Sequence, residues 1–103
     1  MKILVVCGAG ASSTFVASKL RKVAGDRGLS VKVVAGSESQ LEHQLADVDV
    51  VLVGAHLADR ELDLRSRAAA SGVRMAFLPA LAPAHLSGDV ALDLAIDAMG
   101  AAL

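Results

Sequence analysis

The chain has 103 residues, a formal net charge of -1 at pH 7, a hydrophobic fraction of 54% and a single cysteine. This length forms one small domain with one core, and a single cysteine excludes an internal disulfide and a cysteine-built metal site. The near-neutral charge and two aromatic residues argue against nucleic-acid binding. The apolar runs are too short for direct membrane insertion.

Apolar strand patterns alternate with amphipathic helical patterns along the chain. The strands are expected at 2–6, 30–35, 49–53 and 73–78, and the helices begin near Ser13, Ser37, Asp59 and Asp89. Buried strands joined by right-handed crossovers predict a four-stranded parallel sheet. We expect the strand order 2-1-3-4 with helices on both faces, which is a three-layer α/β sandwich.

Local signals predict where the helices end and which faces they bury. The first helix is expected to stop at Gly28 and the third before Gly72. Ser37 and Gln40 predict a capping box at the start of the second helix. The residues expected to face the core are Val16, Leu20, Val23 and Ala24 in the first helix, Leu41 and Leu45 in the second, and Leu92, Ala95, Ile96 and Met99 in the last.

Cys7 follows the first strand and precedes a run of small residues. In a sheet of this order, ligands bind beyond the carboxyl ends of the strands, between strands one and three, where Cys7 falls. A helix N-terminus binds phosphate through its backbone N–H groups and lowers the pKa of a nearby thiol. The pattern therefore predicts a phosphoryl group on Cys7. The loop expected to hold it is Gly8, Ala9, Gly10, Ala11, Ser12, Ser13 and Thr14.

Other interpretations of this segment stay open at this point. The cysteine could be a small buried hydrophobe. Gly8, Gly10 and Ser13, with Glu38 near the second strand, nearly match a dinucleotide-binding fingerprint, but the third glycine is missing. A cysteine phosphatase needs an arginine six residues after the cysteine, where this chain has Ser13. The nearest arginine, Arg21, lies about 12 Å further along the helix, which favours a phosphoryl carrier over a hydrolase.

The segment Cys7–Thr14, following the strand Ile3–Val6, resembles the Cys-x-x-Gly-x-Ser-Ser/Thr loop of a known family. That family is the IIB component (EIIB) of the sugar phosphotransferase system (PTS), lactose/cellobiose (chitobiose) type. The resemblance extends over residues 1–103 as a single EIIB-like domain. The other segments that resemble the family's sequence pattern are Gly28-Leu29, Ser37–Leu41, Asp49–Gly54, Gly72-Val73 and Gly88-Asp89.

The resemblance implies a phosphotransferase activity. Cys7 would accept a phosphoryl group from a phosphohistidine of an EIIA protein and pass it to a sugar bound by the membrane protein EIIC. No metal and no organic cofactor are implied. The chain would be cytoplasmic and held at the inner face of the membrane through EIIC. A non-catalytic IIB-like binding or regulatory module is the alternative from a different class.

The three histidines have different predicted surroundings. His56, in the segment after the third strand, is a candidate auxiliary residue that helps hold the phosphate. His85 is a weaker candidate, and His43 is expected on an exposed helix face. They are too scattered in sequence to form a metal-ligand set.

The docking surface for EIIA is expected along the carboxyl-end rim of the sheet. This rim comprises the Cys7 loop and the segments 54–57 and 79–88. Both segments depart from the family's usual sequence. The apolar contacts expected there are Leu57, Leu81 and Leu86.

Overall fold

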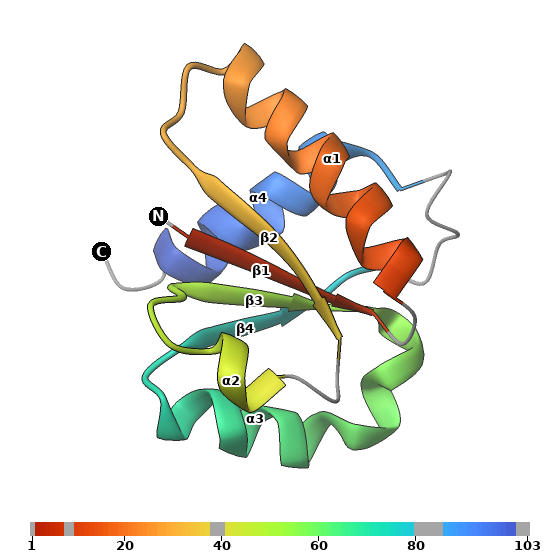
Figure 1. The fold of residues 1–103 in the computed structure, drawn as a ribbon, viewed down its shortest axis with the longest axis vertical. Coiled ribbons are helices and arrows are strands. Elements are labelled where there is room, and N and C mark those ends of the chain that lie inside the picture. The colour runs from red at the N-terminus through yellow and green to blue at the C-terminus, as the bar shows by residue number, and fades with distance from the viewer. Residues whose placement is uncertain (1, 8–9, 38–40, 80–85, 101–103) are drawn as a thin grey trace.

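Four parallel strands form one sheet in the order β2-β1-β3-β4, as the sequence predicts. The computed structural model describes residues 2–7, 10–37, 41–79 and 86–100 (Figure 1). The strands are β1 (Lys2–Cys7), β2 (Lys32–Ser37), β3 (Val50–Val53) and β4 (Arg74–Phe77). The helices are α1 (Gly10–Asp26), α2 (Leu41–Gln44), α3 (Glu61–Ala70) and α4 (Gly88–Gly100), with a 3-10 helix, η2 (Ala55–Arg60), before α3.

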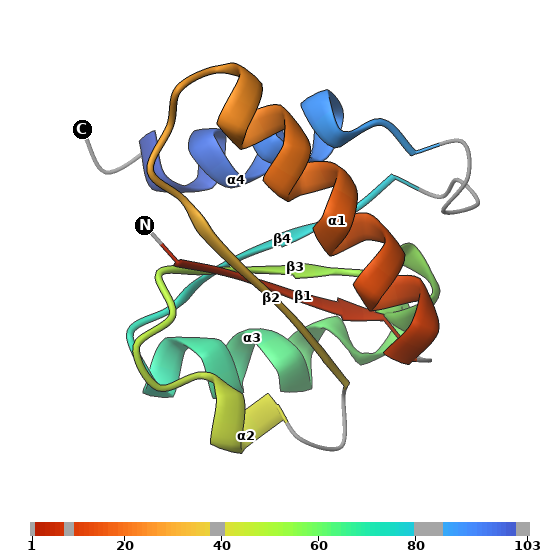
Figure 2. The same cartoon turned by 45° about the horizontal axis from the view of Figure 1, so that its top comes forward.

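The helices cover both faces of the sheet and give the predicted three layers. Figure 2 shows α1 and α4 on one face and α2 and α3 on the other. Successive side chains of a strand point to opposite faces, so each strand feeds two cores. In β1, Ile3 and Val5 join the core under α1 and α4, whereas Leu4 and Val6 join the core over α2 and α3.

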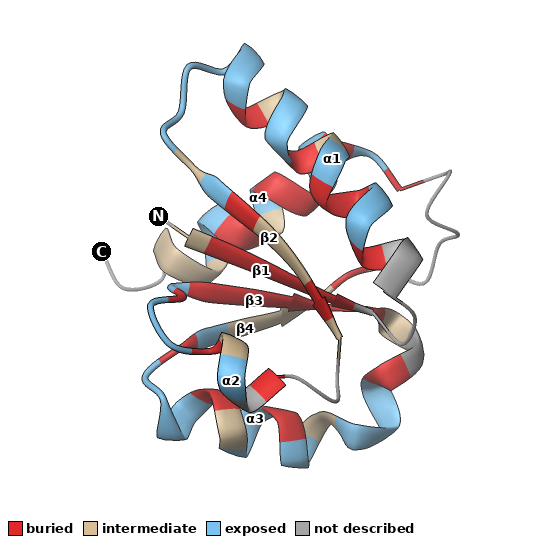
Figure 3. Cartoon of the chain, viewed as in Figure 1, coloured by how far each residue is buried: buried red, intermediate tan, exposed pale blue. Residues whose placement is uncertain are grey.

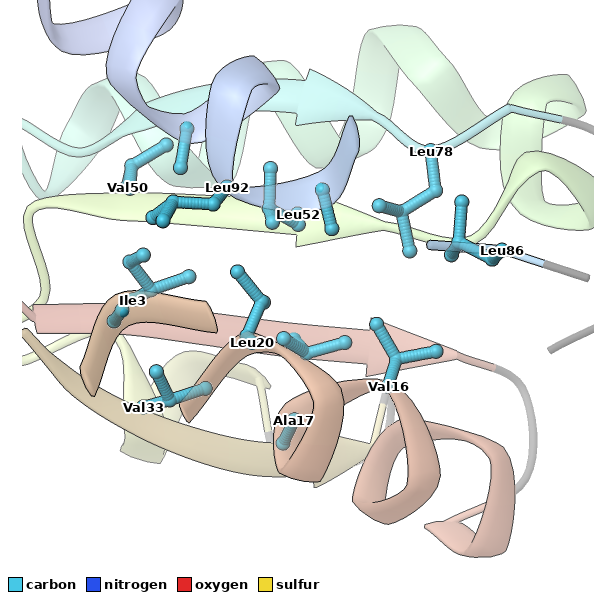
Figure 4. Close-up of a cluster of buried hydrophobic side chains, with 14 residues drawn as sticks. Ile3, Val16, Ala17, Leu20, Val33, Val50, Leu52, Leu78, Leu86 and Leu92 are labelled. Carbon is cyan, nitrogen blue, oxygen red and sulfur yellow. The ribbon is translucent and has the colours of Figure 1, made fainter. Parts of the chain in front are cut away.

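The central strands are buried on both sides. All four residues of β3 are buried, as expected for an inner strand of a parallel sheet, and Figure 3 shows the same for most of β1. Under α1 and α4, Leu20 and Leu92 pack toward the sheet (Figure 4). At the carboxyl end of the strands, Leu78 and Leu86 close this core.

The structure moves some of the predicted boundaries. β2 begins and ends two residues later than the predicted 30–35. Ser37 is its last residue and is in register with Cys7, and α2 begins at Leu41. Gln40 lies outside the described residues, so the predicted capping box stays a prediction. Leu41 and Leu45 are buried as predicted, although α2 has only one turn.

Helix ends and helix faces mostly follow the predictions. Gly28 and Gly72 both have φ of +70°, where a glycine ends a helix without strain. The predicted apolar face of α1 is confirmed. In α4, the prediction for Ile96 is wrong, because its side chain is 36% exposed while Leu92 is fully buried. The residues of α4 that are buried or packed against the core under α1 and α4 include Leu92, Ala95 and Met99, and Ile96 lies at the flank of this face.

Several contacts fix the start of α4 against α1. The Lys19 ammonium donates a 2.8 Å hydrogen bond to the carbonyl oxygen of Leu86. The Arg27 guanidinium bridges Asp89 and Asp93 at 2.8 and 2.9 Å. The hydrogen bonds that Arg27 donates to Asp93 and Asp89 raise the pKa of Arg27 above its ordinary value. The chain before α4 is thereby held beside α1, close to the carboxyl edge of the sheet.

Candidate functional site

Cys7 is the last residue of β1, at the carboxyl edge of an inner strand. On one side it is in register with Ser37 of β2. On the other side, the Gly54 N–H donates a 2.8 Å hydrogen bond to the Val6 carbonyl oxygen, where β3 leads into η2. The backbone of Cys7 therefore lies at the switch point of the sheet, which is the point between β1 and β3 where the connections on either side run in opposite directions.

The segment after Cys7 is more helical than predicted. α1 begins at Gly10, so Gly10–Thr14 form its first turns rather than a loop. Gly8 and Ala9, the remaining members of the predicted loop, lie outside the described residues. Small residues favoured a loop interpretation, but the buried hydrogen bond from Ser13 to Gly36 of β2 outweighs this weak local preference.

The N-terminus of α1 lacks acidic residues. Its first turn contains none. The first turn of α3, in contrast, contains Glu61 and Asp63, and that of α4 contains Asp89. The first N–H groups of a helix carry partial positive charge and have no partner within the helix. No carboxylate of the first turn competes with an anion there. The start of α1 is therefore electrostatically suited to a phosphoryl group.

Ser13 belongs to the predicted Cys7 loop and contacts β2. Its side chain is fully buried, and its hydroxyl donates a 2.8 Å hydrogen bond to the carbonyl oxygen of Gly36. In this structure the hydroxyl proton is directed into the fold rather than toward the edge where Cys7 lies. The bond joins α1 to β2.

Gly36 is enclosed from a second side by Gln44. The side-chain oxygen of Gln44 is buried without a hydrogen-bond partner, and it fills the space that a Cβ at position 36 would occupy. The carboxyl end of β2 is therefore packed between α1 and α2. A larger residue at position 36 would require the flexible Gln44 side chain to move.

The histidine predictions have different outcomes. His43 is exposed on α2, as predicted. His56 is the second residue of η2, close in sequence to the end of β3, and its side chain is not among those described. His85 lies outside the described residues. The role of His56 near the phosphate therefore stays a prediction.

Two of the three apolar residues predicted for the docking rim are buried. Leu57 is buried in the core beneath α3, and Leu86 is buried in the core beneath α1 and α4. Both side chains turn inward because each closes the end of a core. Leu81 lies outside the described residues.

Phe15, the residue directly after the predicted Cys7 loop, is an exposed apolar side chain that was not among the predicted docking residues. It lies in α1, and its ring is 47% exposed. The sequence did contain a signal, since Phe15 falls outside the stripe formed by Val16, Leu20 and Ala24. An aromatic residue off the buried stripe of an amphipathic helix is expected on the surface.

Arg21 serves the sheet rather than the candidate site. Its Nε and Nη2 atoms donate hydrogen bonds of 3.1 and 2.8 Å to the carbonyl oxygen of Val33, in the edge strand β2. The guanidinium therefore does not reach back to Cys7, which agrees with the argument from sequence. It also covers a backbone acceptor on an open sheet edge.

No three His, Cys, Asp or Glu side chains among the residues that the structure describes lie close enough together to hold a metal ion. Within the same residues, no helix has the length and apolar character needed to cross a membrane.

Comparison with known proteins agrees with the fold and the motif. Residues 2–77 match the family model described as the PTS system, Lactose/Cellobiose specific IIB subunit. A cellobiose-specific EIIB component and a galactose-specific EIIB component, both from Lactococcus lactis, are each 28% identical over 102 residues, covering 94% of this chain and of the relative.

Solved structures give the same picture. The lactose-specific IIB domain from Streptococcus pneumoniae superimposes with a TM-score of 0.82 at 17% identity, covering 94% of this chain and 95% of that chain. The cellobiose-specific IIB protein from Borrelia burgdorferi superimposes with a TM-score of 0.77 at 26% identity, covering 97% of this chain and 92% of that chain. The likeness to the first of these concerns the fold.

Proposed function

Because this chain belongs to the lactose/cellobiose-specific IIB family of the phosphotransferase system, we propose that it carries a phosphoryl group on Cys7. The donor is a phosphohistidine of an EIIA protein. The acceptor is a sugar bound by the membrane protein EIIC. The chain works in the cytoplasm, is held at the membrane through EIIC, and requires no metal or organic cofactor.

Each of the two transfers exchanges one bond to phosphorus for another. In the first, the Cys7 thiolate attacks phosphorus, an S–P bond forms, and the N–P bond breaks. The histidine nitrogen that leaves takes up a proton. In the second, a sugar hydroxyl attacks phosphorus, the S–P bond breaks, and the thiolate is restored as the hydroxyl proton departs.

The position of Cys7 carries this proposal. It ends β1, and α1 begins three residues later with no acidic residue in its first turn. The N–H groups of the first turn of such a helix carry partial positive charge, hold the phosphoryl oxygens in both transfers and stabilise the charge on them. Gly8–Ser12 and Thr14 are proposed to contribute to this cradle, and His56 is proposed to assist from η2. Ser13 stabilises the start of α1 through its hydrogen bond to the Gly36 carbonyl oxygen.

Reconstituted sugar phosphorylation tests the proposal. The assay contains phosphoenolpyruvate, the general PTS proteins, an EIIA protein of the lactose/cellobiose type and membranes with EIIC. Cellobiose and galactose are the first sugars to test, because the two curated relatives are named for them. Cys7→Ser should abolish transfer while the far-UV circular dichroism spectrum stays unchanged. Normal sugar phosphorylation by Cys7→Ser would contradict the carrier function and favour the non-catalytic module.

Aryl-phosphate hydrolysis separates the carrier from a cysteine phosphatase. The Arg21 guanidinium is engaged by Val33, and a phosphatase needs an arginine fork on the transferring phosphoryl group. The chain should therefore hydrolyse p-nitrophenyl phosphate no faster than Cys7→Ser does. Turnover that depends on Cys7 would favour the phosphatase.

A further inference from the structure

Phe15 is an exposed aromatic residue close to the start of α1. It lies five residues after Gly10, which is about 7.5 Å along the helix axis. Its ring is 47% exposed, while the adjacent Val16 and Ala17 are buried. The chain has only two aromatic residues, and this one lies in the second turn of the helix that begins at the proposed phosphoryl site. Aromatic residues are enriched among those that dominate protein–protein binding.

The Phe15 ring is held in place by its neighbours. The Lys19 ammonium lies 4.8 Å from the ring centroid, one helical turn further along α1. The same ammonium donates a hydrogen bond to the carbonyl oxygen of Leu86. Leu86 is itself buried beside Leu78 (Figure 4). A ring fixed in this way loses little conformational freedom when a partner binds it.

The charge around Phe15 suits an anionic partner. From Cys7 through Gly25 the chain contains no acidic residue, and Lys19 is the first charged side chain after Cys7. A protein that delivers a phosphoryl group brings negative charge to this rim. Lys19 and the N-terminus of α1 attract that charge as the two proteins approach.

Resting on the proposed function, the geometry points to Phe15 as the aromatic anchor for the phosphohistidine-bearing EIIA protein. The ring, positioned by Lys19, contacts EIIA when the phosphohistidine lies against Cys7. Phe15 thus takes the place of Leu57 and Leu86, which the structure buries. It is a docking residue and takes no part in the bond exchange.

Transfer kinetics from a phosphorylated EIIA protein of the lactose/cellobiose type test this inference. Phe15→Ala should lower the second-order rate constant for transfer to Cys7 about tenfold, which corresponds to about 1.4 kcal/mol. Phe15→Leu keeps an apolar side chain and should stay within about threefold of the wild type. Leu29→Ala is the matched control, because Leu29 is 40% exposed and lies beyond the opposite end of α1. It should not change the rate.

NMR titration with unphosphorylated EIIA gives a second readout that needs no variant. With only two phenylalanines and no tyrosine or tryptophan, the ring resonances of Phe15 are readily assigned. They should shift on addition of EIIA, whereas the methyl resonances of Leu29 should not. Shifts at Leu29 without shifts at Phe15 would overturn the inference.

The possible outcomes separate this inference from the proposed function. If wild type and Phe15→Ala accept the phosphoryl group equally fast, the anchor is wrong and the carrier function stands. Equal slowing by Phe15→Ala and Leu29→Ala would also overturn the anchor. A loss confined to transfer onto the EIIC-bound sugar would do the same, because the ring would then face EIIC. If wild type accepts no phosphoryl group on Cys7, the proposed function itself fails.

Discussion

The Ser13 hydroxyl donates a 2.8 Å hydrogen bond to the carbonyl oxygen of Gly36, joining the first turns of α1 to the carboxyl end of β2. Both residues are buried. Val6 and Gly36 are register partners in adjacent strands, so this bond lies directly beside the end of β1. The bond therefore fixes the helix start relative to the strand that ends in Cys7.

Removing the Ser13 hydroxyl should destabilise the domain. Ser13→Ala leaves the buried Gly36 carbonyl without this donor, which costs about 1–3 kcal/mol. The midpoint of thermal unfolding should fall by about 4–8 °C for each kcal/mol in a domain of this size. Ser18→Ala, at an exposed position of the same helix, is the control and should change the midpoint little. Equal midpoints for the two variants would show that the bond contributes nothing.

Two helical glycines should respond to alanine in opposite directions. A Cβ at Gly88 would lie 2.5 Å from the Lys19 carbonyl oxygen and 2.7 Å from a Val23 methyl carbon, so Gly88→Ala should force α4 away from α1. We expect it to lower the free energy of unfolding by about 1–3 kcal/mol. A Cβ at Gly25, in α1, would meet no atom within 4 Å. Gly25→Ala should therefore raise the free energy of unfolding by about 0.5–1 kcal/mol.

Urea denaturation of both glycine variants measures these changes. An unaltered m-value would show that the midpoint reports stability rather than a change in the unfolded state. A Gly88→Ala variant as stable as the wild type would mean that the contact between α1 and α4 adjusts without cost.

The two neighbouring aliphatic residues of α4 should differ strongly. Leu92 is fully buried between α4 and the sheet, so Leu92→Ala should cost about 2–5 kcal/mol. Ile96 is 36% exposed at the flank of the same helix, so Ile96→Ala should cost markedly less. Urea denaturation of the pair tests the corrected face of α4. Equal losses would restore the inward orientation predicted from sequence.

The order and burial of the strands could be predicted from sequence because these signals are local and strong. The run Val50–Val53 is apolar at every position, which favours an inner parallel strand, and all four residues are buried. Gly28 and Gly72 marked helix ends because a positive φ suits glycine. The parallel order followed from the alternation of strands and helices.

The start of α1 and the role of Ser13 could not be predicted in the same way. Gly10 and the serines after it have weak helix preference, and the helix there depends on contacts with β2, which is distant in sequence. The shift of β2 toward Ser37 has the same origin, since its register is set by β1. Tertiary packing decided these positions, and no local pattern encodes it.

The candidate site was predicted in part. The position of Cys7 at the end of β1 follows from a short apolar run, and the structure agrees. The prediction that Leu57 and Leu86 are docking residues was wrong, because they close the ends of the two cores. Residues outside the strands and main helices look exposed in the sequence, but they are buried where they pack against the apolar end of a core.

Phosphopeptide mapping after incubation with phosphorylated EIIA tests the central claim most directly. The chain is treated with phosphoenolpyruvate, the general PTS proteins and EIIA, then digested and analysed by mass spectrometry under conditions that preserve S–P bonds. We predict one phosphoryl group, on Cys7, that is released by iodine and absent from Cys7→Ser. Two results would contradict the account: a phosphoryl group on His56, or no phosphoryl group on this chain while EIIA remains phosphorylated.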